Sequence, residues 1–188
     1  MKKFRDGMLG PTVILGTICL VITFALAGTY EATKEPIRLA GLRAAETARA
    51  LVLPAARTEE APQGAEEEAE ESFVLIEGIA LPEGVKEAYK AVNGSGYVFV
   101  AGAKGFGGVV TFYVGVDADG NYVGINMFDH DETPGLGTKV GADSYLEKYY
   151  GRNTPSGVDA ITGATRTSNA LKNTLLACNE AYELVKEA

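Results

Sequence analysis

The chain has 188 residues and a formal net charge of −8, with 17 Lys and Arg against 25 Asp and Glu. This length is enough for one membrane anchor and one modest domain with its own core. The charge is uneven, because residues 1–30 carry a net +2 and the remainder therefore carries −10. A domain this acidic, without a basic patch, binds nucleic acid poorly, so we expect no nucleic-acid partner.

The first predicted element is a membrane-spanning helix over residues 8–30. A helix needs about 20 mostly apolar residues to cross a bilayer, and the segment from Gly7 to Tyr30 contains no charged residue. A cleaved signal peptide is the alternative, with Ala25-Leu26-Ala27 as its best cleavage site, but the apolar run is long for one. The basic residues within residues 1–7 predict a cytoplasmic arm and place the chain after Tyr30 outside the cytoplasm.

Two further segments precede the main domain. Residues 31–57 form an Ala-rich helical connector, because small and apolar residues recur at helical spacing. Pro36 fits the first turn of this helix, and Leu53-Pro54 ends it. Residues 58–72 contain seven Glu and predict a solvated acidic loop, since a run of like charges repels itself and is a poor cation site.

Residues 73–188 predict one α+β domain. Segments rich in β-branched and aromatic residues predict strands at 73–77, 85–92, 97–100, 109–116 and 122–128. The run from Asp117 to Asn121 predicts a hairpin turn in preference to a calcium loop, because it lacks the terminal Glu of an EF-hand. Helices are predicted at 140–150 and 168–186, the second with five inward residues: Leu171, Leu175, Leu176, Ala177 and Leu184. Strands in a row flanked by helices indicate a mainly antiparallel sheet.

The most specific segment is Asp159-Ala160-Ile161-Thr162-Gly163-Ala164-Thr165, directly ahead of the last predicted helix. Small residues surround Thr165, so a bulky group can approach its hydroxyl, and a helix N-terminus is a ready phosphate site. On local physics alone, capping of the helix by Thr165, Thr167 or Ser168 is favoured. A hydrolytic nucleophile would need an adjacent base, and the only histidine, His130, belongs to another segment.

That other segment is Glu132-Thr133-Pro134-Gly135-Leu136-Gly137-Thr138-Lys139, between a predicted strand and a predicted helix. Its Pro and Gly residues predict a rigid loop with exposed backbone amides, which can hold a polar ring or a phosphate. Ordinary turns share this composition, so alone it is weak evidence. We interpret His130 as a strand-end residue held by hydrogen bonds, in preference to a proton donor.

Together the two segments resemble the FMN-binding domain of bacterial respiratory flavoproteins, whose acceptor motif reads D-x-x-[ST]-G-A-[ST]. The Glu-Thr-Pro-Gly-Leu-Gly run ahead of that motif is similar to the same families. The resemblance covers essentially the whole chain and is closest to the G subunits of Rnf electron-transport complexes. The C subunits of sodium-pumping NADH:quinone oxidoreductases are similar but longer. One departure is Asp131, where the family often has a basic or polar residue.

The resemblance implies FMN joined covalently through its phosphate to the hydroxyl of Thr165. It also implies cofactor contacts from the rest of both segments: Asp159, Thr162, Gly163 and Ala164, and Glu132, Thr133, Gly135, Leu136, Gly137, Thr138 and Lys139. Asp159 would bind the Mg²⁺ of a flavin-attaching transferase or shape the turn. Lys139 would offset the charge of reduced flavin or phosphate, or be a plain surface lysine. No site for a metal of the protein's own is predicted.

The resemblance further implies a subunit that relays electrons within a ferredoxin:NAD⁺ oxidoreductase complex coupled to ion translocation. Its partners would be the other membrane and peripheral subunits, in a bacterial or archaeal cell membrane. No Gly-x-Gly-x-x-Gly follows a predicted strand, so no motif for binding a nicotinamide dinucleotide is present. As a relay subunit, the chain is expected to turn over no substrate of its own. The alternative from another class is a membrane-anchored binding or scaffold module without a cofactor.

Overall fold

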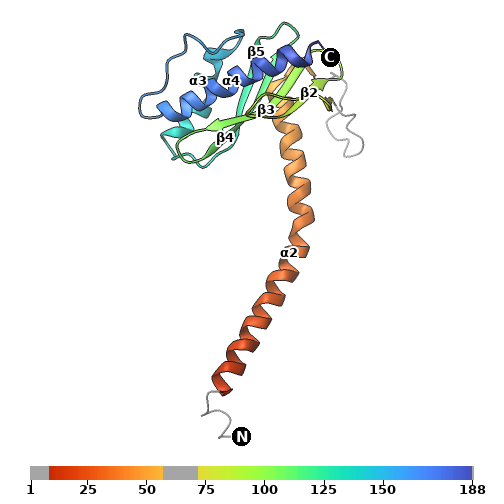
Figure 1. The fold of residues 1–188 in the computed structure, drawn as a ribbon, viewed down its shortest axis with the longest axis vertical. Helices are drawn as coiled ribbons and strands as arrows, with labels where there is room; N and C mark the ends of the chain where they lie inside the picture. Colours follow the sequence, from red (N-terminus) through yellow and green to blue (C-terminus); the bar gives the residue numbers. More distant parts are fainter. Residues whose placement is uncertain (1–8, 57–71, 188) are drawn as a thin grey trace. The chain divides into compact units, whose positions relative to one another are not determined.

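The computed structural model describes residues 9–56 and 72–187. The predicted cytoplasmic arm (1–7) and nearly all of the predicted acidic loop (58–72) therefore lie outside the described residues. The chain divides into two compact units, Met1–Ala45 and Glu46–Ala188 (Figure 1).

The first unit consists of most of α2, a helix that runs without a break from Leu9 to Val52. Its large apolar side chains between Val13 and Phe24 are all exposed. The most apolar stretch has a mean hydropathy of 2.1, and the helix is long and apolar enough to cross a membrane. An apolar surface on every side is what contact with lipid requires.

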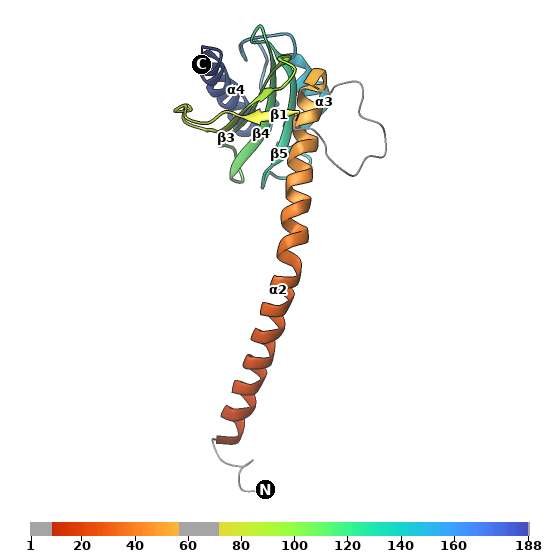
Figure 2. The ribbon, with the colours of Figure 1, turned by 90° about the vertical axis from the view of Figure 1, so that its right-hand side faces the viewer.

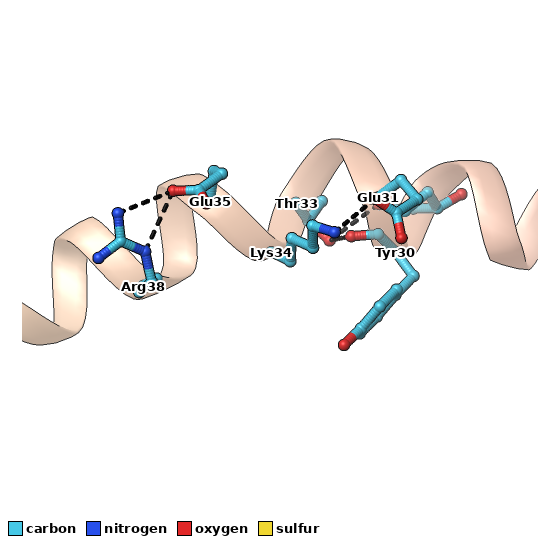
Figure 3. Close-up of polar contacts among 7 residues, drawn as sticks. Tyr30, Glu31, Thr33, Lys34, Glu35 and Arg38 are labelled. Carbon is cyan, nitrogen blue, oxygen red and sulfur yellow. Dashed lines mark hydrogen bonds and ion pairs between the residues drawn. The ribbon is translucent and has the colours of Figure 1, made fainter.

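Charged residues enter α2 directly after its apolar stretch. Lys34 Nζ lies 2.6 Å from Glu31 Oε2, and Arg38 Nη2 lies 3.1 Å from Glu35 Oε2 (Figure 3). Pro36 lies between these exposed pairs, inside the helix. The expectation that Pro36 opens a second helix is therefore wrong: the helix continues through it, at the expense of one backbone hydrogen bond that proline cannot donate.

The second unit contains a five-stranded antiparallel sheet in the order β1-β2-β3-β4-β5. The strands are β1 Phe73–Leu75, β2 Val85–Ala91, β3 Gly96–Lys104, β4 Val109–Asp117 and β5 Tyr122–Asp129. All five predicted strands are present, and the predicted α+β class is confirmed. β3 continues past its predicted end because its pairing with β4 extends to Lys104 opposite Val109, through small residues that carry no strand signal.

The helical elements after the sheet are η2 Gly137–Gly141, α3 Asp143–Leu146, η3 Glu147–Tyr149 and α4 Thr165–Val185. The single helix predicted over 140–150 is thus a series of short turns. α4 begins three residues earlier than the predicted 168. This earlier start places Thr165 in the first turn of the helix.

α4 covers one face of the sheet (Figures 1 and 2). Leu171 and Leu175 are fully buried as predicted, but Leu176 and Leu184 are 48% and 46% exposed. The prediction for these two residues is wrong. The buried residues of α4 recur at helical spacing along one face of the helix, and Leu176 and Leu184 lie outside that face. The buried residues are Thr167, Ser168, Ala170, Leu171, Thr174, Leu175, Cys178, Ala181, Tyr182 and Val185.

Residues 46–56 cover the opposite face of the sheet, so that the sheet is the middle layer of this unit (Figure 2). Val52 and Leu53 are each only 1% exposed. Gly115 and Gly124 pair across β4 and β5, and a Cβ on either would overlap the carbonyl oxygen of Val52. The two glycines therefore allow the end of α2 to approach the strands at backbone distance.

Candidate functional site

A cavity of about 310 Å³ lies where the β3–β4 turn, the loop after β5 and the first turn of α4 meet. This volume falls within the range of about 300–1,000 Å³ common for small-molecule sites. The fold thus brings together the two segments that stand out in the sequence. The lining residues are Phe106, Glu132, Thr133, Leu136, Gly137, Gly163, Ala164, Thr165, Arg166 and Thr167.

The start of α4 forms one wall of the cavity. The N-cap residue is Ala164, and no side chain caps the helix with a hydrogen bond. The interpretation of Thr165, Thr167 or Ser168 as a cap is therefore wrong, because all three lie within the helix itself. Thr165 is exposed, and its hydroxyl has no hydrogen-bond partner among the residues that the structure describes.

Backbone geometry makes this wall receptive to an anion. The N–H of Ser168 donates to the carbonyl of Ala164 at 2.9 Å. The N–H groups of residues 165–167 precede this bond, so they have no acceptor within the helix. Together with the helix dipole, these N–H groups favour a negatively charged group beside Thr165.

The segment before Thr165 is held from two sides. Ser168 is completely buried, and its Oγ accepts the N–H of Ile161 at 3.1 Å. The hydroxyl of Tyr145, on α3, donates to the carbonyl of Asp159 at 3.1 Å. These bonds tie the acceptor segment to its neighbours in the core, so that Thr165 stands at the end of a fixed loop.

Glu132 joins the walls of the cavity. Its side chain is buried, and Oε1 accepts the N–H of Phe106 at 2.8 Å and of Gly107 at 3.0 Å. Oε2 accepts the hydroxyl of Thr167 at 2.7 Å. Burial raises the pKa of Glu132, but the hydrogen bonds from Thr167, Gly107 and Phe106 outweigh it, and the pKa is below its ordinary value. Glu132 therefore lines the cavity and also links the β3–β4 turn to the first turn of α4.

The lowered pKa of Glu132 makes stability depend on pH. A carboxyl group whose pKa is depressed by folding stabilises the fold above its unfolded-state pKa, ordinarily 4.5. That contribution is lost as the pH falls through the lower folded-state value. We expect the free energy of unfolding of the wild type to fall more steeply below pH 4.5 than that of Glu132→Gln, measured by urea titration at several pH values. Thr167→Val should give an intermediate slope, and parallel curves for wild type and Glu132→Gln would contradict the assignment.

Several other predicted site residues lie outside the lining. Within the loop after β5, Thr138 Oγ1 accepts the N–H of Gly135 at 2.9 Å, so this pair stabilises the turn. His130 Nδ1 lies 3.4 Å from the N–H of Glu132, which donates to it. The predicted residues that do not line the cavity are Asp159, Thr162, Gly135, Thr138 and Lys139.

Three lining residues, Phe106, Arg166 and Thr167, were not among the predicted contacts. Phe106, in the β3–β4 turn, is 66% exposed. Leu136, another lining residue, is 47% exposed, and such apolar side chains suit a flat ring. Proximity in sequence to the acceptor motif was the available signal for Arg166 and Thr167. For Phe106, the signal was a large apolar residue followed by two glycines.

An apolar-lined cavity, a helix N-terminus and an exposed hydroxyl together suit a phosphorylated ring cofactor. Residues 105–180 match the FMN-binding domain family, and every lining residue falls within this range. FMN is therefore the cofactor of this domain.

The chain is 30% identical over 192 residues to the G subunit of the ion-translocating oxidoreductase complex of Cereibacter sphaeroides, covering 93% of this chain and 84% of that protein. It is 31% identical to the G subunit of the Na(+)-translocating ferredoxin:NAD(+) oxidoreductase complex of Acetobacterium woodii, covering 91% and 89%. Similarity to the C subunit of the Na(+)-translocating NADH-quinone reductase of Pasteurella multocida, at 31% identity, covers only 52% and 47%.

The chain belongs to the family of G subunits of Rnf-type ion-translocating oxidoreductase complexes. It is a membrane-anchored flavin protein of electron transfer and works with the other components of such a complex. The alternative assignment to the C subunits is not favoured, since that similarity covers about half of each chain.

Proposed function

We propose that FMN is esterified through its phosphate to the hydroxyl of Thr165. The chain would use it to relay electrons inside a ferredoxin:NAD⁺ oxidoreductase complex coupled to ion translocation, the reaction named for the Acetobacterium relative. The observation that carries this proposal is the position of Thr165 in the first turn of α4, at the wall of the cavity, with a hydroxyl that has no partner among the described residues. When bound, FMN supplies the redox chemistry, and the protein supplies orientation and electrostatics.

The lining residues divide into two groups that fit the two ends of FMN. Phe106 and Leu136 offer apolar surface to the flavin ring. The N–H groups at the start of α4 offer donors to the phosphate. Gly163 also lines the cavity, just before α4, and its φ of +84° is a conformation that other residues rarely adopt.

Forming the ester requires a separate transferase and an activated flavin phosphoryl donor. In this transfer, the oxygen of Thr165 would form the new bond to the phosphorus next to the flavin. The phosphoanhydride bond of the donor would break, and the rest of the donor would leave with its own phosphate. The hydroxyl proton of Thr165 would be released. Asp159 is exposed and outside the cavity lining. We propose that the carboxylate of Asp159 contacts the transferase during attachment and binds the Mg²⁺ of that enzyme.

A hydrolytic role for Thr165 lacks a base. Glu132 is the one carboxylate among the lining residues, and three protein donors occupy its oxygens. Its lowered pKa also makes it a weak base. Catalysis by a nucleophilic hydroxyl needs a stronger partner than this.

The test of the proposed function is peptide mass analysis of the segment that contains Thr165, on protein from cells that also express the flavin-attaching transferase. We expect this peptide to carry the added mass of one esterified FMN, with fragmentation placing the adduct on Thr165. An unmodified peptide from such cells would overturn covalent attachment at Thr165.

We also propose that the FMN-binding domain lies outside the cytoplasm. Support comes from Lys2, Lys3 and Arg5 ahead of the apolar helix, by the positive-inside rule. Protease added to intact cells, stripped of any outer membrane, is expected to digest the domain. Protection of the domain until the cells are opened would contradict this orientation.

A further inference from the structure

The charge of the cavity wall depends on two residues. Among the lining residues, only Glu132 and Arg166 carry ionisable side chains. Both oxygens of Glu132 accept hydrogen bonds from the protein, from Phe106, Gly107 and Thr167. Arg166 is exposed, and its guanidinium has no ion pair among the described parts of the chain. Arg166 is therefore the one positive charge among the lining residues, whereas the hydrogen bonds of Glu132 direct its carboxylate oxygens toward protein groups.

We propose that Arg166 raises the reduction potential of the bound flavin by supplying a positive charge at the cavity wall. This inference rests on the proposed function, since it concerns the cofactor held at Thr165, the residue next to it. Reduction adds negative charge to the flavin, and a nearby cation lowers the free energy of the reduced flavin. A local cation matters in this domain because the chain after residue 30 carries a net −10, and that charge disfavours an anionic reduced flavin.

Lys139 is the competing candidate for this role. It follows Glu132 in the same segment, and the sequence left it open as a counter-charge to reduced flavin or a plain surface lysine. The structure, however, places it on η2, exposed and outside the cavity lining. Charge interactions between groups near the surface weaken quickly with distance in salt solution, so the residue on the wall has the larger effect.

The experiment compares flavin midpoint potentials in the full-length protein, measured by spectroelectrochemical titration. The variants are Arg166→Gln, Arg166→Met, Arg166→Lys and, as the matched control, Lys139→Gln. We expect lower potentials for both neutral variants at Arg166 and near-wild-type potentials for Arg166→Lys and Lys139→Gln. The difference between wild type and Arg166→Gln should shrink as ionic strength rises.

The fluorescence of each band on a denaturing gel records covalent flavin separately from its potential. If all variants carry flavin but Arg166→Gln and Arg166→Met keep the wild-type potential, the role of Arg166 is overturned while attachment at Thr165 stands. A shift in Lys139→Gln alone would transfer the role to Lys139 and overturn it as well. Absence of flavin from every variant and from wild type would overturn this inference together with the proposed function.

Discussion

Replacing Thr165 by valine is expected to abolish covalent flavin while leaving the fold intact. Valine keeps the shape of threonine but removes the oxygen that would form the phosphoester. FMN that is merely bound at micromolar affinity is held by about 8 kcal/mol and is lost on a denaturing gel. The fluorescent band should therefore fall to background. Because the hydroxyl of Thr165 makes no hydrogen bond among the described residues and the side chain is exposed, the stability should change by no more than about 0.5 kcal/mol.

Two companion variants separate the hydroxyl from other effects of mutation. Thr165→Ser retains an oxygen at the same position and is expected to keep the fluorescent band. Thr154→Val removes another exposed hydroxyl, shortly before the acceptor segment, and should leave the band at wild-type intensity. A band of full intensity in Thr165→Val would show that the flavin is attached elsewhere.

Gly115→Ala is expected to destabilise the domain strongly, although it adds a single methyl group. That methyl would overlap the carbonyl oxygen of Val52, and backbone cannot rotate away as a side chain can. Relief requires residues 52 and 53 to move off the sheet, which exposes two side chains that are now 1% exposed. We expect a loss of about 2–4 kcal/mol, seen as a fall of roughly 10 °C in the thermal unfolding midpoint.

Gly124→Ala should produce a similar loss, because its Cβ would meet the same carbonyl oxygen. The matched control is Gly108→Ala. There the nearest neighbour of the new Cβ is Asp131 Oδ2 at 3.7 Å, an ordinary contact. If Gly115→Ala unfolds at the temperature of Gly108→Ala, the close approach of Val52 does not limit stability.

Local sequence signals were sufficient for most of the sheet. β-branched and aromatic runs such as Val109 to Val116 bury residues on both faces of the sheet, and their turns carry Gly and Asp. The Asp117 turn behaves as predicted: its Oδ1 accepts the N–H groups of Asp119 and Asn121 at 2.9 and 2.8 Å. Such interactions join residues only a few positions apart, so the local sequence is enough to predict them.

Long-range packing could not be predicted in the same way. Glu132 was placed near the cofactor by resemblance, but its bonds to Phe106 and Thr167 join residues that are 26 and 35 positions away. The burial of Val52 against Gly115 and Gly124 likewise depends on a strand pair much later in the chain. The start of α4 was misplaced because Thr165 and Arg166 have no apolar periodicity; tertiary contacts of Thr167 and Ser168 fix that turn instead.

The packing of residues 46–56 on the sheet determines where the protein can be cut. The FMN-binding domain family spans only residues 105–180, a range that omits β1, β2 and β3. Even a fragment that starts at Phe73 would lack Val52, so the face of the sheet at Gly115 and Gly124 would be exposed. A water-soluble version for crystallography or electrochemistry should therefore begin no later than Glu46, where the second compact unit starts, and keep the last turns of the anchoring helix as part of the folded domain.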